Sequence, residues 1–517
     1  MNIFDGIILG FYVALTPMNL MFAFLGALIG TAVGVLPGLG PAATIALLLP
    51  ITYSISSPVP AVIMMAGIYY GAMYGGSTTS ILLNLPGEAA SVVTCIDGYK
   101  MAQKGRAGPA LGIAAIGSFV AGTAAVVGLT LFAPPIAEFA LSFGPPEKFS
   151  LALLGLLMAV TLSGASVTKG LIIMVLGLLL GTVGIDPISG KSRFDFGVTE
   201  LQSGFDFVTI AVGVFGLGEI FYNLEQEGSV EIITTKVGQV FPKMADWVKS
   251  RMAILRGTLI GFFIGIIPGG GAVISSLVSY AVEKKVSKHP EEFGQGAIEG
   301  VAGPESANNA ASSSSFIPLL TLGIPGNAAI AMIYACLLIK GVKPGPFLMV
   351  EHPDVFWGVI ASMYVGNIML IILNLPLVGI WVQLLRVPYG ILAPVVILFT
   401  AIGSYSIANQ AFDLYALIAF GVLGYVLRKL KIEAGPLPLA FILGPMIEAS
   451  MRQSLLISGG SFSIFVTRPI SLTIVALFAL FVIGQMVFAF RHARRRSIAL
   501  GGVPIGTPAS TPKGGKK

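Results

Sequence analysis

Long apolar stretches follow one another through most of the chain, and the polar segments between them are short. Runs such as 171–185, 357–384 and 469–490 approach or reach the roughly 20 residues that a membrane-spanning helix needs. Within lipid, a helix satisfies its own backbone hydrogen bonds. We therefore predict an all-α polytopic membrane protein with roughly 10 to 12 transmembrane segments, several of them short, broken, re-entrant or paired as hairpins.

The apolar stretches fall into two groups. Residues 1–224 form the first group and 257–490 the second, and the segment 225–256 between them carries charged side chains without a long apolar run. We predict two membrane repeats joined by a cytoplasmic connecting segment. The C-terminal residues 491–517 begin with arginines and continue with Gly, Pro, Ser and Thr, which predicts a basic, disordered cytoplasmic tail.

Composition agrees with a membrane protein. Of 517 residues, 55% are hydrophobic and only 10% are charged, whereas soluble domains carry about 25% charged residues. The net charge of +6 resides in short basic clusters, which the positive-inside rule explains better than nucleic-acid binding does. The N-terminal residues 1–16 show no cleavable signal, and we expect them to be retained. Cys95 and Cys336 lack a metal or redox spacing.

The two halves share a motif. Residues 26–40 read GALIGTAVGVLPGLG and 257–271 read GTLIGFFIGIIPGGG, with eight of fifteen positions identical at an offset of 231. A second correspondence follows: Ser77, Thr78, Thr79 and Ser80 precede Pro86-Gly87, and Ser312 to Ser315 precede Pro325-Gly326. The spacing between polar run and Pro-Gly differs, so this pairing requires a gap. We predict an internal, inverted repeat in which each half carries a broken helix and a hydroxyl-rich segment.

Paired breaks of this kind are typical of a transporter binding site. A helix broken within the membrane exposes N–H groups that suit anions and C=O groups that suit cations, and glycine allows a ligand to approach them closely. The alternative is that the prolines only kink helices and the glycines only permit tight packing.

The second half also contains the polar stretch 303–315, GPESANNAASSSS, which would be costly facing lipid. We predict that it lines a wet cavity, with a solvated loop as the alternative. Glu88 and Glu305 are candidate proton carriers, unless they lie at a membrane edge. The predicted substrate- or ion-binding residues, with a possible sodium site among them, are Pro37, Gly38, Gly40, Ser77, Thr78, Thr79, Pro268, Gly269, Gly270, Gly271, Asn308, Asn309, Ser312 and Ser313.

The runs GVLPGLGP at 34–41, PGGG at 268–271 and the polar stretch 303–315 resemble the large membrane subunit of the tripartite tricarboxylate transporters. The similarity extends to about residue 490. It implies a secondary transporter in the bacterial inner membrane that is driven by an ion gradient, sodium or proton, and uses no cofactor. It also implies a periplasmic binding protein that delivers the carboxylate and a small membrane subunit of about four spanning helices. A homodimer is a further expectation.

Two other classes stay open. A passive anion channel could also use broken half-helices. An intramembrane enzyme is less well supported, because the three histidines lack metal spacing and the chain has no Gly-x-Ser-x-Gly or His-Glu-x-x-His motif. We therefore expect a transporter rather than an enzyme.

Overall fold

The computed structural model describes residues 2–36, 40–163, 166–186, 188–225, 240–384, 393–394, 397–398, 400–402, 404–405 and 410–499. The fold is helical, as predicted, with one two-stranded antiparallel hairpin of β1 (Gly184–Ile185) and β2 (Ser192–Arg193). The helices of the first half are α1 (Ile3–Ala14), α2 (Pro17–Val35), α3 (Pro41–Leu48), η1 (Leu49–Ser54), α4 (Pro58–Leu83), η2 (Ala89–Val92), α5 (Thr94–Gln103), α6 (Ala107–Ala140), α7 (Pro145–Ser163), α8 (Val167–Leu180), η3 (Thr199–Ser203), α9 (Phe207–Ala211), η4 (Val212–Leu217) and α10 (Gly218–Glu225).

The second half begins with α11, inside the segment predicted as the connection. Its helices are α11 (Met244–Ile266), α12 (Gly271–Val286), η5 (Pro290–Glu292), α13 (Glu299–Ser314), α14 (Phe316–Leu322), α15 (Ala328–Ile339), α16 (Leu348–Glu351), α17 (Pro353–Asn374), α18 (Val378–Leu384), α20 (Ala411–Lys429), α21 (Pro436–Ile457), α22 (Ile464–Thr467) and α23 (Pro469–Ala499). Helix α23 continues through 491–499, the first part of the predicted tail, and 500–517 lie outside the described residues.

Five helical stretches within the described residues are long and apolar enough to cross a membrane: 17–35, 107–140, 207–225, 353–374 and 411–429. Shorter apolar helices, such as α3 and α15, accompany them. The chain is therefore a multi-pass membrane protein, and the number of crossings stays a prediction.

Two helix pairs pack in the same way, α2 on α4 and α11 on α13. A Cβ added to Gly26, Gly30 or Gly34 of α2 would lie within 2.5 Å of one carbonyl oxygen of α4, namely that of Met64, Ile68 or Ala72, respectively. On α11, Gly257, Gly261 and Gly265 approach Gly303, Ala307 and Ala311 as closely. These glycines of the repeated motif therefore serve helix packing, as the packing alternative proposed.

The chain divides into two compact units. The first contains 1–143 and 155–449, and with it both copies of the motif. The second contains 144–154 and the residues from 450 onward. Within the second unit, Arg468 Nε donates to Glu147 Oε1 at 2.6 Å, and the Ser150 and Ser471 hydroxyls lie 2.8 Å apart.

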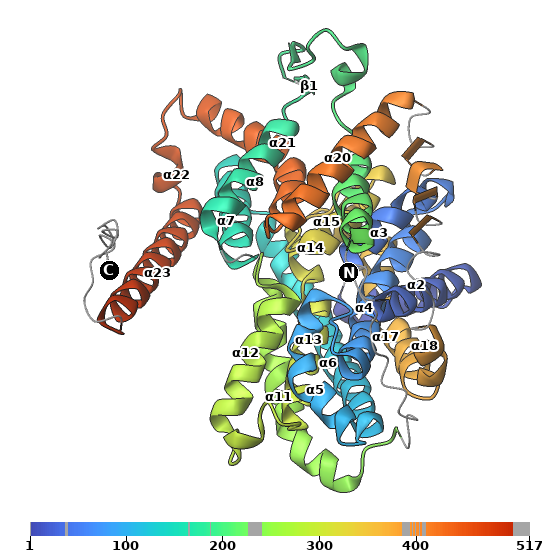
Figure 1. Ribbon diagram of the computed structural model, residues 1–517. Helices are drawn as coiled ribbons and strands as arrows, with labels where there is room; N and C mark the ends of the chain where they lie inside the picture. The colour runs from blue at the N-terminus through green and yellow to red at the C-terminus, as the bar shows by residue number, and fades with distance from the viewer. Residues whose placement is uncertain are drawn as a thin grey trace, which may run out of the picture. The chain divides into compact units, whose positions relative to one another are not determined.

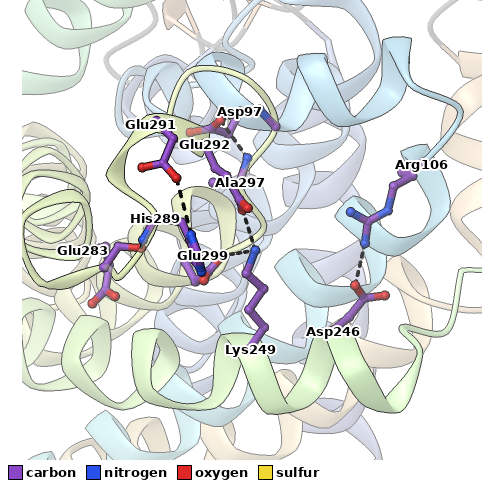
Figure 2. A network of polar contacts seen from close by, with 12 residues as sticks. Asp97, Arg106, Asp246, Lys249, Glu283, His289, Glu291, Glu292, Ala297 and Glu299 are labelled. Carbon is purple, nitrogen blue, oxygen red and sulfur yellow. Dashed lines mark hydrogen bonds and ion pairs between the residues drawn. The ribbon is translucent and has the colours of Figure 1, made fainter.

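A polar network gathers residues from α5, α11 and the segment 287–299 at one end of the first unit (Figures 1 and 2). Asp97 Oδ1 accepts from the backbone N–H groups of Gly294, Gly296 and Ala297 at 2.7 to 2.9 Å. Lys249 Nζ lies 2.5 Å from Glu292 Oε2, and this hydrogen bond lowers the pKa of Glu292. Lys104 Nζ also donates to the Gln295 carbonyl at 2.6 Å, so basic residues from α11 and from the end of α5 both contact the segment 287–299.

Candidate functional site

The broken helices and the Pro-Gly segments of both halves surround one cavity of about 410 Å³ in the first unit. Four stretches form much of its wall: 40–43, 86–89, 269–274 and 326–329. Each contains the N-terminus of a helix, namely α3, η2, α12 and α15. Backbone N–H groups at helix N-termini lack helical partners and carry partial positive charge. Three of these are α-helices, α3, α12 and α15, whose N-termini favour an anion at the cavity, whereas the Glu88 carboxylate already occupies the N-terminus of the short η2.

In the second half, the chain breaks between α11 and α12. Ile266 ends α11, and Gly269 has a φ of +80°, a conformation that glycine adopts without strain. Its N–H donates to the Gly326 carbonyl at 2.7 Å, which ties the break to the second Pro-Gly segment. A Cβ at Gly269 would lie 2.4 Å from Ala159 Cα, so packing also requires this glycine.

In the first half, α2 ends at Val35 and α3 begins at Pro41. The predicted residues Pro37 and Gly38 lie outside the described residues. Gly40 is described and lines the cavity, and a Cβ built on it would have no neighbour within 4 Å. The two breaks predicted from the repeat therefore reach one cavity, through Gly40 and through Gly269, Gly270 and Gly271.

The two Pro-Gly segments share a local structure. Asn84 ends α4 and Gly323 ends α14, both in the left-handed conformation at φ +57° and +68°. After each Pro-Gly, a polar side chain caps the next helix: Glu88 accepts from Ala90 N and Asn327 accepts from Ile330 N. Each residue of the second segment is 239 positions after its counterpart in the first.

Hydrogen bonds cross between the halves in matching pairs. Asn308 Nδ2 donates to Glu88 Oε1 at 3.1 Å. Asn327 Nδ2 donates to the Tyr69 hydroxyl, also at 3.1 Å. By the same offset of 239, Asn308 corresponds to Tyr69 and Asn327 corresponds to Glu88. The two hydrogen bonds therefore join corresponding positions, with the roles of the two halves exchanged. Glu88, Tyr69 and Asn327 all line the cavity.

The polar stretch 303–315 differs from both interpretations drawn from its sequence. It is neither a solvated loop nor a wall of the described cavity, but almost entirely the buried helix α13. Asn309 Nδ2 donates to Ser118 Oγ at 2.7 Å, and Ser312 Oγ donates to the Asn308 carbonyl at 2.9 Å. Ser313 is buried on the same helix. Asn308 reaches the cavity-lining Glu88 by a hydrogen bond, and Ser312 lies within hydrogen-bonding reach of the cavity-lining Tyr69.

The hydroxyl run of the first half is also buried and does not line the cavity. Ser77 Oγ donates to Glu305 Oε2 at 2.6 Å, Thr79 donates to the Val35 carbonyl, and Thr78 is buried beside them on α4. Pro268 precedes Gly269 and is absent from the described lining, although its Cα lies 3.8 Å from a Cβ built on Gly326.

Charged residues of α10, α20 and the segment after α20 complete the wall, and the sequence analysis did not predict them as site residues. Arg428 lines the cavity, donates to Glu219 Oε1 at 3.0 Å, and lies over the Tyr222 ring at 5.5 Å. Glu219 and Glu433 also line it. Arg428, Lys429 and Lys431 form one of the short basic clusters that the positive-inside rule explains. No grouping of His, Cys, Asp and Glu suited to a metal ion occurs among the described residues.

Comparison with known proteins identifies the family. Residues 20–439 match the sequence profile of the tripartite tricarboxylate transporter TctA family. An uncharacterized 52.8 kDa protein from the TAR-I ttuC' 3' region of Agrobacterium vitis is 52% identical over 494 residues, which cover 96% of this chain and 98% of that protein.

A second protein of the same organism, from the TAR-II ttuC' 3' region, is 50% identical over 234 residues, 45% of this chain and 97% of its own length. No solved structure matches. The chain therefore belongs to the TctA family of tripartite tricarboxylate transporters, as its motifs predicted, and is a membrane subunit of such a transporter.

Proposed function

We propose that the cavity bounded by 40–43, 86–89, 269–274 and 326–329 binds the transported carboxylate. The observation that carries this proposal is the convergence of three α-helix N-termini, those of α3, α12 and α15, on one cavity. Their N–H groups offer an anion site on both sides of a central space. Arg428 adds a guanidinium, whose geometry suits carboxylates. A substrate carboxylate that replaces Glu219 as its partner would connect binding to movement of α10 and α20.

The two halves form an inverted repeat around this cavity. The exchanged contacts between positions 69 and 327 and between 308 and 88 support a pseudo-two-fold relation. Alternating access then follows from rocking one repeat against the other while the cavity opens to each side in turn.

Uptake is coupled to a cation gradient, proton or sodium. The described lining contains three carboxylates, Glu88, Glu219 and Glu433, and one guanidinium, Arg428. An anionic substrate would meet this excess of negative charge unless protons or metal cations neutralise part of it. The chain acts in the bacterial inner membrane with a small membrane subunit and a periplasmic binding protein that delivers the carboxylate.

The test is uptake of radiolabelled citrate by cells that express the complete transporter. Citrate that accumulates above its external concentration, and is lost when the ion gradients are collapsed, is the expected result. Flux that only equilibrates citrate would favour a passive channel. No flux of citrate or other carboxylates would contradict both.

A further inference from the structure

Glu88 is a carboxylate at the cavity wall with no basic partner. Its side chain is 5% exposed. Oε1 accepts from Asn308 Nδ2 at 3.1 Å and Oε2 accepts from Ala90 N at 2.5 Å. None of the ion pairs in the described part of the chain includes Glu88. An ionised carboxylate held away from water without a cationic partner is costly, and the binding of a cation or proton relieves that cost.

The corresponding residue of the second half shows that helix capping does not need this charge. Asn327 occupies the same place after Pro-Gly, and its amide oxygen accepts from Ile330 N at 3.0 Å. A neutral amide therefore caps α15 as Glu88 caps η2. A carboxyl group at 88 adds what an amide lacks, a negative charge that a proton can neutralise.

Asn308 is suited to both protonation states of Glu88. Its Nδ2 donates to Glu88 Oε1, while its Oδ1 is buried and has no hydrogen-bond partner among the described residues. Asn308 is 1% exposed. Rotation of the amide by half a turn would direct Oδ1 at Glu88 and let it accept from a protonated carboxyl. An unpaired buried acceptor beside a carboxylate thus has a partner once that carboxylate binds a proton.

The ligands around Glu88 suit a proton better than a metal cation. The hydrogen-bond donors on its two carboxylate oxygens are nitrogen atoms, Asn308 Nδ2 and Ala90 N. Hard cations require several oxygen ligands around them. In the described structure, both oxygens of Glu88 are occupied by N–H groups instead.

Building on the proposed carboxylate transport, we infer that Glu88 binds and releases the coupling proton, with Asn308 as its partner in both states. On the outward-open side, a hydronium ion in the cavity gives its proton to Oε1, so that an O–H bond of the hydronium breaks, water is left, and an O–H bond forms on Oε1. On the inward-open side, that bond breaks and the proton returns to water. No electron transfer is involved, and the neutral carboxyl reduces the negative charge that the substrate meets.

Glu305 is the other buried carboxylate nearby, and its surroundings indicate a structural role. It is 0% exposed and lies outside the described cavity lining. Ser77 and Thr94 donate to its two oxygens, so it joins α13 to α4 and α5. Without access to the cavity, Glu305 has no direct route for a proton to enter and leave with the substrate.

Other titratable or charged groups also act on Glu88. Tyr69 on α4, Cys95 on α5 and Glu305 on α13 interact with it electrostatically. Tyr280 and Glu283 lie further along α12, the helix whose Ser276 contacts the Ala90 carbonyl. The remaining charged groups of the cavity wall are Glu219, Arg428 and Glu433.

The test compares Glu88→Gln with Glu305→Gln, a matched carboxyl-to-amide change away from the cavity. The complete transporter is reconstituted in sodium-free liposomes with the membrane potential held at zero. Citrate accumulation is then measured against an imposed pH gradient, and citrate exchange is measured without a gradient. Wild type and Glu305→Gln should accumulate citrate with the pH gradient, by about tenfold per unit for one proton carried. Glu88→Gln should show no response to the pH gradient, and the citrate exchange that it retains should not vary with pH, whereas exchange by wild type should. Loss of exchange together with accumulation would assign Glu88 to substrate binding and would contradict the inference.

The inference is overturned if Glu88→Gln still accumulates citrate with the pH gradient, or if Glu305→Gln alone loses that response. Should Glu88→Gln not fold, Glu88→Asn, which copies Asn327, replaces it. An internal pH dye in wild-type liposomes gives an independent measurement, in which citrate entry without accompanying proton entry contradicts the inference. A wild-type protein that moves no carboxylate in either assay would instead overturn the proposed function.

Discussion

Arg428 offers the most direct test of carboxylate binding at the scale of a single side chain. Replacing it with Gln removes the one basic side chain of the described cavity wall. Hydrogen bonds to charged groups contribute about 1.5–3 kcal/mol, and a substrate must displace Glu219 to form them. We therefore expect the KM for uptake to rise about tenfold, measured as initial rates per folded molecule.

Lys429 is the matched control for Arg428. It is the next residue on α20, and it pairs with Glu225 at 2.8 Å without lining the cavity. Lys429→Gln should leave the KM unchanged. An equal loss in both variants would mean that the general charge of α20 matters and that Arg428 has no specific contact with substrate.

The glycines of the two breaks should respond differently to a methyl group. Gly40 has free space on its Cβ side and lies at the cavity wall, so Gly40→Ala should fold normally and weaken apparent substrate affinity several-fold. Gly269 has φ +80° and faces the Ala159 backbone, so Gly269→Ala should lose folded protein. The strain alone costs about 1–3 kcal/mol.

Detergent-solubilised yield and uptake per folded molecule separate these two effects. Normal transport by Gly40→Ala, with normal affinity, would show that the backbone near Gly40 does not contact the substrate.

At the scale of elements, Asp97 holds the segment 287–299 against α5. Three backbone N–H groups and the Tyr280 hydroxyl donate to its carboxylate. Asp97→Ala would leave these donors without their acceptor, and we expect a loss of about 3 kcal/mol in stability. The measurement is the thermal unfolding midpoint, together with faster protease cleavage within 287–299.

Glu291→Gln is the control for this segment. Glu291 pairs with His289, and both side chains are more than half exposed. Such surface pairs contribute little, at most about 1 kcal/mol. A similar unfolding midpoint for Asp97→Ala and Glu291→Gln would contradict the anchoring role of Asp97.

The sequence predicted the elements of the site better than their register. The Pro-Gly-x-Gly motif marks a helix break in each half, so Gly40 and Gly269 were found from the motif alone. The hydroxyl runs were paired by composition, with a gap. In the structure, each residue of α4 that contacts a glycine of α2 corresponds to the residue of α13 that is 239 positions later, and the two Pro-Gly segments are related by the same offset. By this offset, residues 77–80 correspond to 316–319. The hydroxyl runs themselves are therefore one helical turn apart.

Sequence patterns could not predict which side chains from helices far apart in the chain meet at the cavity. Arg428 belongs to a basic cluster of the kind that follows many membrane helices, and only the tertiary structure places it beside Glu219 at the cavity. The polar helix α13 is the converse case. Its Ser312 and Ser314 hydroxyls donate to carbonyls of α13 itself, and Asn309 donates both to Ser118 of α6 and to the Glu305 carbonyl. Polarity in a membrane sequence thus indicates a buried network as readily as a wet surface.

At the scale of the whole molecule, the halves meet at one cavity that presents helix N-termini from each. In the proposed function, each half supplies part of an anion site that neither half completes alone. A transporter of this design should bind its carboxylate at Gly40 and Gly271 at once, whichever side is open.

Cysteine protection tests that claim most directly. With Cys95 and Cys336 replaced by Ala, Gly40→Cys places a thiol in the open space of the cavity and Lys288→Cys places one in the exposed segment after α12. Membranes containing the complete transporter are labelled with a charged thiol reagent, with and without citrate or another transported carboxylate. The account predicts that the transported carboxylate slows labelling at position 40 and leaves labelling at position 288 unchanged. Equal labelling of Gly40→Cys with and without a carboxylate that the variant still transports would contradict it.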